Sequence, residues 1–79
     1  MSREEALKKI NEILIDEFED DDLVISESTV AADVDGWDSL AHLSIINEIE
    51  NEFGIKFLMG EIQEMKNIGE MIDIIISRL

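Results

Sequence analysis

Two adjacent polar residues, Asp38 and Ser39, stand where an irregular, acid-rich segment gives way to an apolar-periodic run that reaches Phe53. Asp38 is well suited as a helix N-cap, because its short carboxylate can accept hydrogen bonds from the free N–H groups of a first helical turn. Ser39 would then project from the positive end of the helix dipole, where backbone donors favour an attached anion such as a phosphate. The pair therefore predicts either a simple helix cap or a serine that carries a phosphodiester.

The only histidine, His42, follows Ser39 by one helical turn. A serine and a histidine this close could be the nucleophile and general base of a hydrolase. The sequence has no G-x-S-x-G elbow and no second histidine. We therefore expect His42 to lie partly buried at the edge of the helix core, with its ring bonded to a loop carbonyl, and we expect no catalytic residue.

The segment Asp33-Val34-Asp35-Gly36 invites comparison with a calcium-binding loop. With Gly36 at the sixth place of that motif, the first place is Ala31 and the twelfth is His42. The motif needs an Asp and a bidentate Glu at these places. No metal site is predicted.

Residues 3–18 have the pattern of an amphipathic helix. Ser2, followed three residues later by Glu5, forms a capping-box pattern at its start. Apolar residues then recur at the three- and four-residue steps of one helical face: Ala6, Leu7, Ile10, Ile13, Leu14 and Phe18. Acidic residues 19–22 end the pattern because like charges repel. Residues 19–37 are predicted to form a long loop with a short turn near 29–32, anchored by Leu23, Ile25, Val30 and Val34.

Three further helices are predicted after this loop. One covers residues 39–53, with Ile45, Ile46, Ile49 and Phe53 on its core face and Gly54 as a C-terminal stop. An apolar crossing segment, Ile55, Phe57, Leu58 and Met59, leads to a short helix over 61–65. Asn67 and Glu70 repeat the capping-box pattern before a last helix with the stripe Ile68, Met71, Ile72, Ile75 and Leu79. The fold class is all-α, a small four-helix bundle with a long first loop and a short third helix.

The composition limits the possible functions. Seventy-nine residues make a single domain, 1–79, which has no room for a deep active-site cavity. The net charge of −14, from 20 acidic and 6 basic residues, argues against nucleic acid and anionic membranes and favours partners with basic faces. There is no cysteine, no membrane-length apolar run and no signal-peptide pattern. We expect a cytoplasmic monomer that is not inserted in a membrane.

The motif Asp38-Ser39-Leu40, with Gly36-Trp37 before it and Ile49-Glu50-Asn51-Glu52-Phe53-Gly54-Ile55 after it, resembles the acyl carrier protein family. The resemblance covers nearly the whole chain. It implies that Ser39 accepts 4′-phosphopantetheine from coenzyme A, and that the thiol of this arm carries an acyl group as a thioester. The implied partners are a phosphopantetheinyl transferase, an acyl-carrier synthetase or ligase, and acyl-processing enzymes of fatty acid, polyketide or related biosynthesis.

In this family the helix after the serine is the recognition helix. The residues that would contact partners are Trp37, Leu40, Leu43, Asn47, Glu48, Glu50 and Glu52, with Glu61 and Glu64 further along the chain. Ala41 and Ser44 stand where fatty-acid-type carriers usually have acids. This favours a dedicated pathway, whose partners would recognise the shape of the surface near Ser39 more than its charge. Two alternatives stay open: an aminoacyl or peptidyl carrier of a stand-alone ligase system, and an acidic helical adaptor that is never modified.

Overall fold

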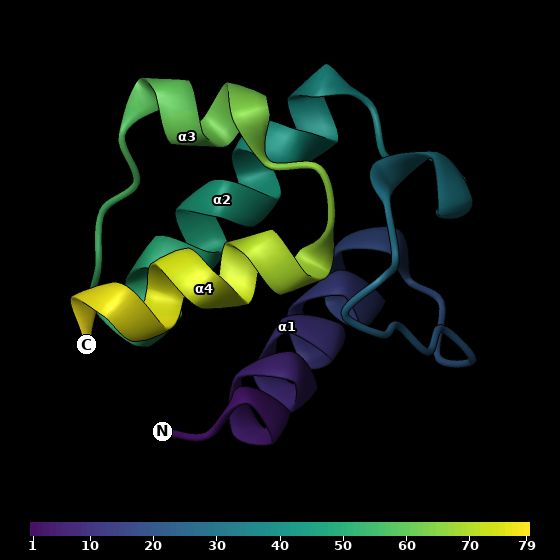
Figure 1. Cartoon of the computed structure of the whole chain (residues 1–79). Helices are drawn as coiled ribbons and strands as arrows, with labels where there is room; N and C mark the ends of the chain where they lie inside the picture. Colours follow the sequence, from purple (N-terminus) through teal and green to yellow (C-terminus); the bar gives the residue numbers. More distant parts are fainter.

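The computed structural model describes residues 1–79 and is all-helical (Figure 1). It contains four α-helices, α1 (Arg3–Phe18), α2 (Ser39–Phe53), α3 (Met59–Glu64) and α4 (Ile68–Arg78), and one turn of 3₁₀-helix, η1 (Ala31–Asp33). The predicted four-helix bundle with a long first loop and a short third helix is confirmed. Helix α3 begins earlier than expected, because the Glu61 side chain accepts a hydrogen bond from Leu58 N over 2.8 Å and caps the helix there.

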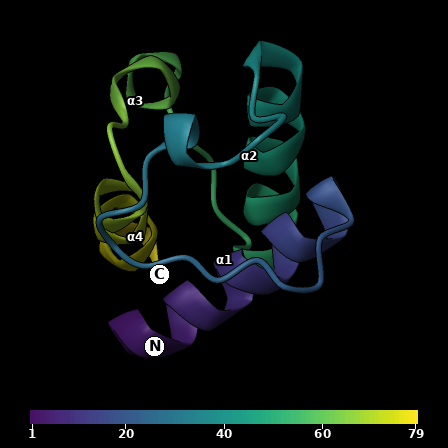
Figure 2. The same cartoon turned by 90° about the vertical axis from the view of Figure 1, so that its right-hand side faces the viewer.

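Helix α1 packs against both α2 and α4. In Figure 1, α4 passes in front of α2, with α3 above them and α1 to the lower right. Seen from the side in Figure 2, η1 lies in front of the space between α2 and α3. The core between the helices is almost purely aliphatic and includes these buried residues: Ala6, Ile10, Leu14, Ile45, Ile46, Ile49, Phe53, Ile68, Met71, Ile72 and Ile75.

Local capping signals fix the ends of the helices. Ser2 and Glu5 form the predicted capping box at the start of α1. Helix α2 ends at Gly54, whose φ of +68° is the left-handed conformation that glycine adopts at little cost. At α4, Asn67 caps Glu70 N over 2.9 Å, but the Glu70 carboxylate accepts from Lys66 N and not from Asn67, so only half of the predicted box forms.

The long first loop is held down by apolar and polar contacts. Ile25 and Val34 are buried as predicted, whereas Leu23 and Val30 are only half-buried. The Asn11 side chain adds a polar anchor, since its Nδ2 donates to Leu23 O over 3.1 Å and its Oδ1 accepts from Ile25 N over 2.7 Å. One asparagine of α1 thereby satisfies the backbone of the loop on both sides of Val24.

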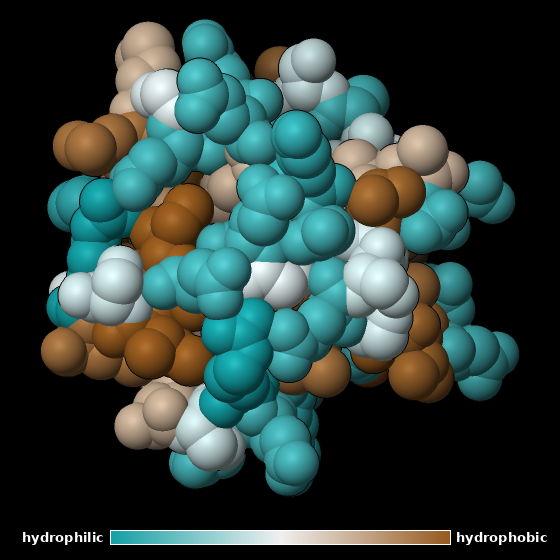
Figure 3. Space-filling model, viewed as in Figure 1, coloured by the Kyte–Doolittle hydropathy of each residue, from teal (hydrophilic) through white to brown (hydrophobic).

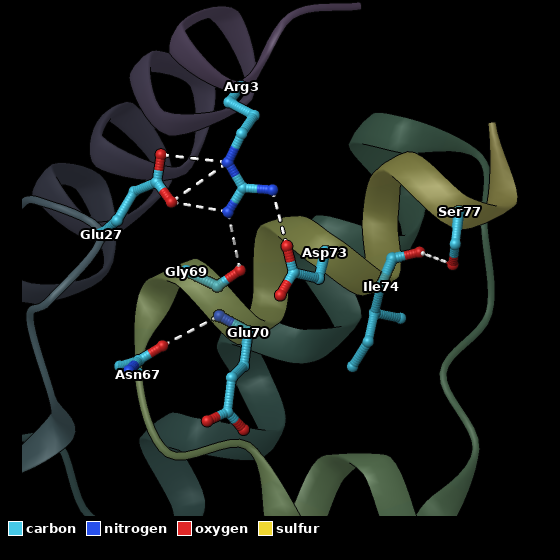
Figure 4. A network of polar contacts seen from close by, with 8 residues as sticks. All are labelled: Arg3, Glu27, Asn67, Gly69, Glu70, Asp73, Ile74 and Ser77. Carbon is cyan, nitrogen blue, oxygen red and sulfur yellow. Dashed lines mark hydrogen bonds and ion pairs between the residues drawn. The ribbon is translucent and has the colours of Figure 1, made fainter.

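A second polar anchor joins three segments (Figure 4). The Arg3 guanidinium of α1 bonds the Glu27 carboxylate of the loop and donates from Nη1 to Asp73 Oδ1 of α4 over 2.6 Å. Its Nη2 also donates to Gly69 O over 3.2 Å. Because Gly69 N donates to Glu27 O over 2.8 Å, the loop and the first turn of α4 are tied together by backbone as well.

Three apolar residues singled out in the sequence are exposed: Leu58 and Met59 of the crossing segment, and Leu79 of the last helical stripe. Leu58 is the N-cap residue of α3 and Met59 is its first residue, and both side chains are exposed to solvent. Leu79 lies beyond the last turn of α4, with 58% of its surface exposed. Hydrophilic residues cover much of the face shown in Figure 3, and hydrophobic residues gather toward its left side, between α3 and the end of α4. None of the four helices is long and apolar enough to cross a membrane.

Candidate functional site

Ser39 is the first residue of α2 and is exposed. Asp38 is the N-cap, as predicted, and its Oδ1 accepts a hydrogen bond from Ala41 N over 2.8 Å. No hydrogen bond engages the Ser39 hydroxyl or the N–H groups of Ser39 and Leu40. The first turn of α2 also contains no acid. These free donors at the positive end of a helix suit an anion attached to Ser39.

Trp37 is fixed beside this helix start. Gly36, with φ of +89°, turns the chain just before it, and a Cβ atom added there would lie 3.6 Å from the Phe18 ring. The Trp37 and Phe18 ring centroids are 6.1 Å apart and tilted by 41°, a contact typical of aromatic pairs. Trp37 is therefore half-buried at the junction between α1 and α2.

His42 does not face Ser39 as a general base would. Its Nδ1 accepts a hydrogen bond from Trp37 Nε1 over 3.1 Å, and its Nε2 lies 3.0 Å from Ile62 O of α3. The prediction of a half-buried histidine bonded to a carbonyl is confirmed, although this carbonyl belongs to α3 and not to a loop. With both ring nitrogens engaged elsewhere, the arrangement contradicts the hydrolase alternative.

An open groove of about 610 Å³ lies next to Ser39, which we call the outer groove. Its lining comes from the end of the first loop, the start of α2 and helix α3: Ala31, Trp37, Asp38, Ser39, His42, Leu43, Ile62, Gln63 and Met65. The contribution of Ala31, Gln63 and Met65 was missed by the sequence analysis. No spacing in the sequence predicts their place beside Ser39, because Ala31 reaches it through the path of the first loop, and Gln63 and Met65 through the way α3 crosses α2.

The predicted partner-binding residues fall on different faces. Leu40 and Leu43 are 80% and 57% exposed next to Ser39, and Asn47 and Glu52 are exposed further along α2. Glu48 is exposed too but faces α1, where burial and then the carboxylates of Glu17 and Asp16 raise its pKa. Leu40 and Leu43 therefore form the apolar surface nearest to the serine.

Two acids predicted as partner contacts are bonded within the fold. The Glu50 side chain is only 14% exposed, and its Oε2 accepts a hydrogen bond from Phe57 N over 2.8 Å. Glu61 binds Arg78 through two hydrogen bonds of 2.6 Å, and these, with its cap on Leu58, lower its pKa. Glu50 and Glu61 are therefore less exposed than expected, because Phe57 N and Arg78 bond their carboxylates, and their contact with partners stays a prediction.

Comparison with known proteins gives a consistent result along almost the whole chain. Residues 8–75 match the family profile described as "Phosphopantetheine attachment site". The acyl carrier protein of Lactobacillus acidophilus is 35% identical over 78 residues, covering 98% of this chain and 96% of that protein. The acyl carrier protein of Rubrobacter xylanophilus is 32% identical over 78 residues, covering 98% and 95%.

A solved structure agrees with the sequence relatives. The solution structure of a holo acyl carrier protein from Geobacter metallireducens superposes with a TM-score of 0.85 at 37% sequence identity. The alignment covers 92% of this chain and 84% of that one. The likeness thus extends over fold and sequence together.

Proposed function

This chain belongs to the acyl carrier protein family, whose cofactor is 4′-phosphopantetheine, and we propose that Ser39 is its attachment residue. The proposed role is to hold an acyl intermediate as a thioester and to deliver it to enzymes of fatty acid, polyketide or related biosynthesis. Carriers of this family are not enzymes. The observation that carries the proposal is the position of the Ser39 hydroxyl, which is exposed and unbonded at the start of α2.

The attachment chemistry fits this geometry. A bond forms between Ser39 Oγ and a phosphorus of coenzyme A as the phosphoanhydride breaks, and the nucleotide part leaves with the second phosphate. The hydroxyl proton passes to a base of the transferase, and Mg²⁺ bound there neutralises the developing charge. On the carrier, the free N–H groups of Ser39 and Leu40 would be available to the new phosphodiester, and Asp38 caps this helix end. When bound, the arm supplies the thiol for the thioester.

Partner docking is proposed on the apolar surface of Leu40 and Leu43, with Asn47 one turn further along α2. Glu48 and Glu52 are proposed as further contacts along the helix, on the side toward α1. Leu40 and Leu43 are exposed within a turn or so of Ser39, whereas the nearest α2 acids lie further along the helix. Apolar anchors surrounded by polar residues are typical of protein interfaces. A Leu43→Glu variant should accept the arm more slowly from a transferase, while Leu58→Glu, which changes an exposed leucine outside this surface, should not.

The main test is the intact mass of the protein before and after incubation with coenzyme A, Mg²⁺ and a promiscuous phosphopantetheinyl transferase. The wild type should gain one phosphopantetheine group and Ser39→Ala none. Ser44→Ala is the matched control, since Ser44 is also exposed on α2 but its Oγ is bonded to Glu17 over 2.8 Å. It should still be modified. No gain by a folded wild type would contradict the carrier function and favour the unmodified acidic adaptor.

A further inference from the structure

A second, smaller and partly open space lies beside the outer groove and shares four lining residues with it, which we call the wall. This inner space has a volume of about 40 Å³ and lies between the first loop and the start of α4, where Thr29, Asn67, Ile68 and Met71 are among its lining residues. The wall consists of the residues that line both spaces: Ala31, Trp37, His42 and Met65. A group attached to Ser39 and lying in the outer groove would have to pass this wall to enter the inner space directly.

Hydrogen bonds lock the wall in place. The indole N–H of Trp37 can only donate, so His42 Nδ1 must accept and His42 Nε2 must carry the proton that it donates to Ile62 O. The imidazole is thereby fixed from both sides and links Trp37, two residues before α2, to helices α2 and α3. Opening the wall would break both bonds and leave half-buried polar groups without partners, which is costly.

The inner space is too small for an acyl chain. About 40 Å³ suffices for roughly one water molecule, whereas an apolar cavity that binds benzene measures about 150 Å³. The outer groove is much larger and is reached directly from Ser39.

We propose that Trp37 and His42 act as specificity-determining residues that exclude the acyl chain from the helix interior and keep the thioester end in the outer groove. This inference rests on the proposed function at Ser39. It narrows the cargo to short acyl or aminoacyl groups, because a long aliphatic chain would remain in water along an open groove. Such a chain gains stability only where its methylene groups are buried.

The test compares two thioesters on the same protein. Acetyl- and octanoyl-pantetheine arms are transferred to Ser39 from the corresponding acyl-coenzyme A, and the intact mass confirms loading. Cleavage of each thioester by hydroxylamine is then followed by mass. The wild type should lose both acyl groups at the same rate, because neither is sheltered. In Trp37→Ala the octanoyl thioester should be cleaved about tenfold or more slowly than the acetyl one, since the opened wall lets methylene groups enter.

Controls separate the possible outcomes. Trp37→Phe keeps a ring but removes the donor to His42, so partial protection would assign part of the effect to the hydrogen bond. Met59→Ala alters an exposed α3 residue outside the groove and should behave like the wild type.

Protection of the octanoyl thioester on the wild type would overturn the inference while leaving the carrier function intact, and this comparison needs no variant to fold. Equal cleavage on a folded Trp37→Ala would also overturn it. Failure to load any arm would instead contradict the proposed function, and the inference with it.

Discussion

Arg3 and Asp73, 70 positions apart in the chain, are joined by a hydrogen bond of 2.6 Å between Nη1 and Oδ1. The same guanidinium holds Glu27 and lowers the pKa of that carboxyl group. One side chain thus connects the start of α1, the first loop and α4.

This arrangement predicts an acid-sensitive contribution to stability. Replacing Arg3 by Met should lower the melting temperature modestly at neutral pH, because the ion pairs are half-exposed and screened. The Glu27 pKa is lower in the folded state, so its contribution is present above the unfolded pKa and is lost as pH falls through the folded one, below 4.5. The gap between wild type and variant should therefore shrink in acid. Lys8→Met, at an exposed α1 residue without an ion pair, is the control, and a pH-independent gap for Arg3→Met would contradict the role of the Glu27 pair.

Glu48 should show the opposite sign. Burial raises its pKa, helped by Glu17 and Asp16, so the ionised form is disfavoured in the fold. Its unfavourable contribution develops as pH rises from the unfolded pKa, near 4.5, through the higher folded pKa. Glu48→Gln should therefore raise the melting temperature at neutral pH and lose this advantage below pH 4.5. The exposed Glu12→Gln serves as the control, and an equal gain there would point to net charge alone.

Replacing either of two glycines that have open space around them by alanine should change the stability, but in opposite directions. A methyl group added at Gly54 or Gly60 would meet no atom within 4 Å, so only the backbone decides. Gly54 has φ of +68°, and alanine there should cost about 1 kcal/mol in the free energy of unfolding. Gly60 lies within α3, where alanine should add about 0.5–1 kcal/mol. Urea unfolding measures both, and a loss at Gly60 would show that α3 needs more freedom than its helical geometry indicates.

Glu50 and Glu52 should differ although both are acids of α2. Glu50→Ala leaves the N–H of buried Phe57 without its acceptor, at a cost of about 1–3 kcal/mol in unfolding free energy. Glu52→Ala should change the free energy of unfolding by no more than about 0.5 kcal/mol. Glu52 is exposed, and its ion pair with Lys9 is long, with 3.8 Å between Oε2 and the lysine Nζ. Similar losses for both would refute a structural role specific to Glu50.

The sequence was sufficient for features that depend on neighbours in the chain. The caps at Ser2, Asp38 and Asn67 and the glycine stop at Gly54 involve residues within one turn, so their spacing predicted the helix ends. The same locality made the position of Ser39 predictable. Periodicity failed at Leu79, because an apolar repeat does not tell where a helix runs out of partners to pack on.

Features that depend on how helices cross were not predictable. The hydrogen-bonded link from Trp37 through His42 to Ile62 requires α3 to lie over the start of α2. No residue spacing in the sequence predicts this arrangement of the two helices. The inward turn of Glu50 likewise depends on the path of the chain after Gly54. Both cases concern polar side chains whose partners were fixed only by tertiary packing.

Trp37 is also the only tryptophan of a chain without tyrosine. Because it lies against Phe18, bonds His42 and lines the groove beside Ser39, its fluorescence originates from this one place in the molecule. The protein therefore carries its own optical probe. Attachment at Ser39 and arrival of a partner can each be followed by emission from an unlabelled sample.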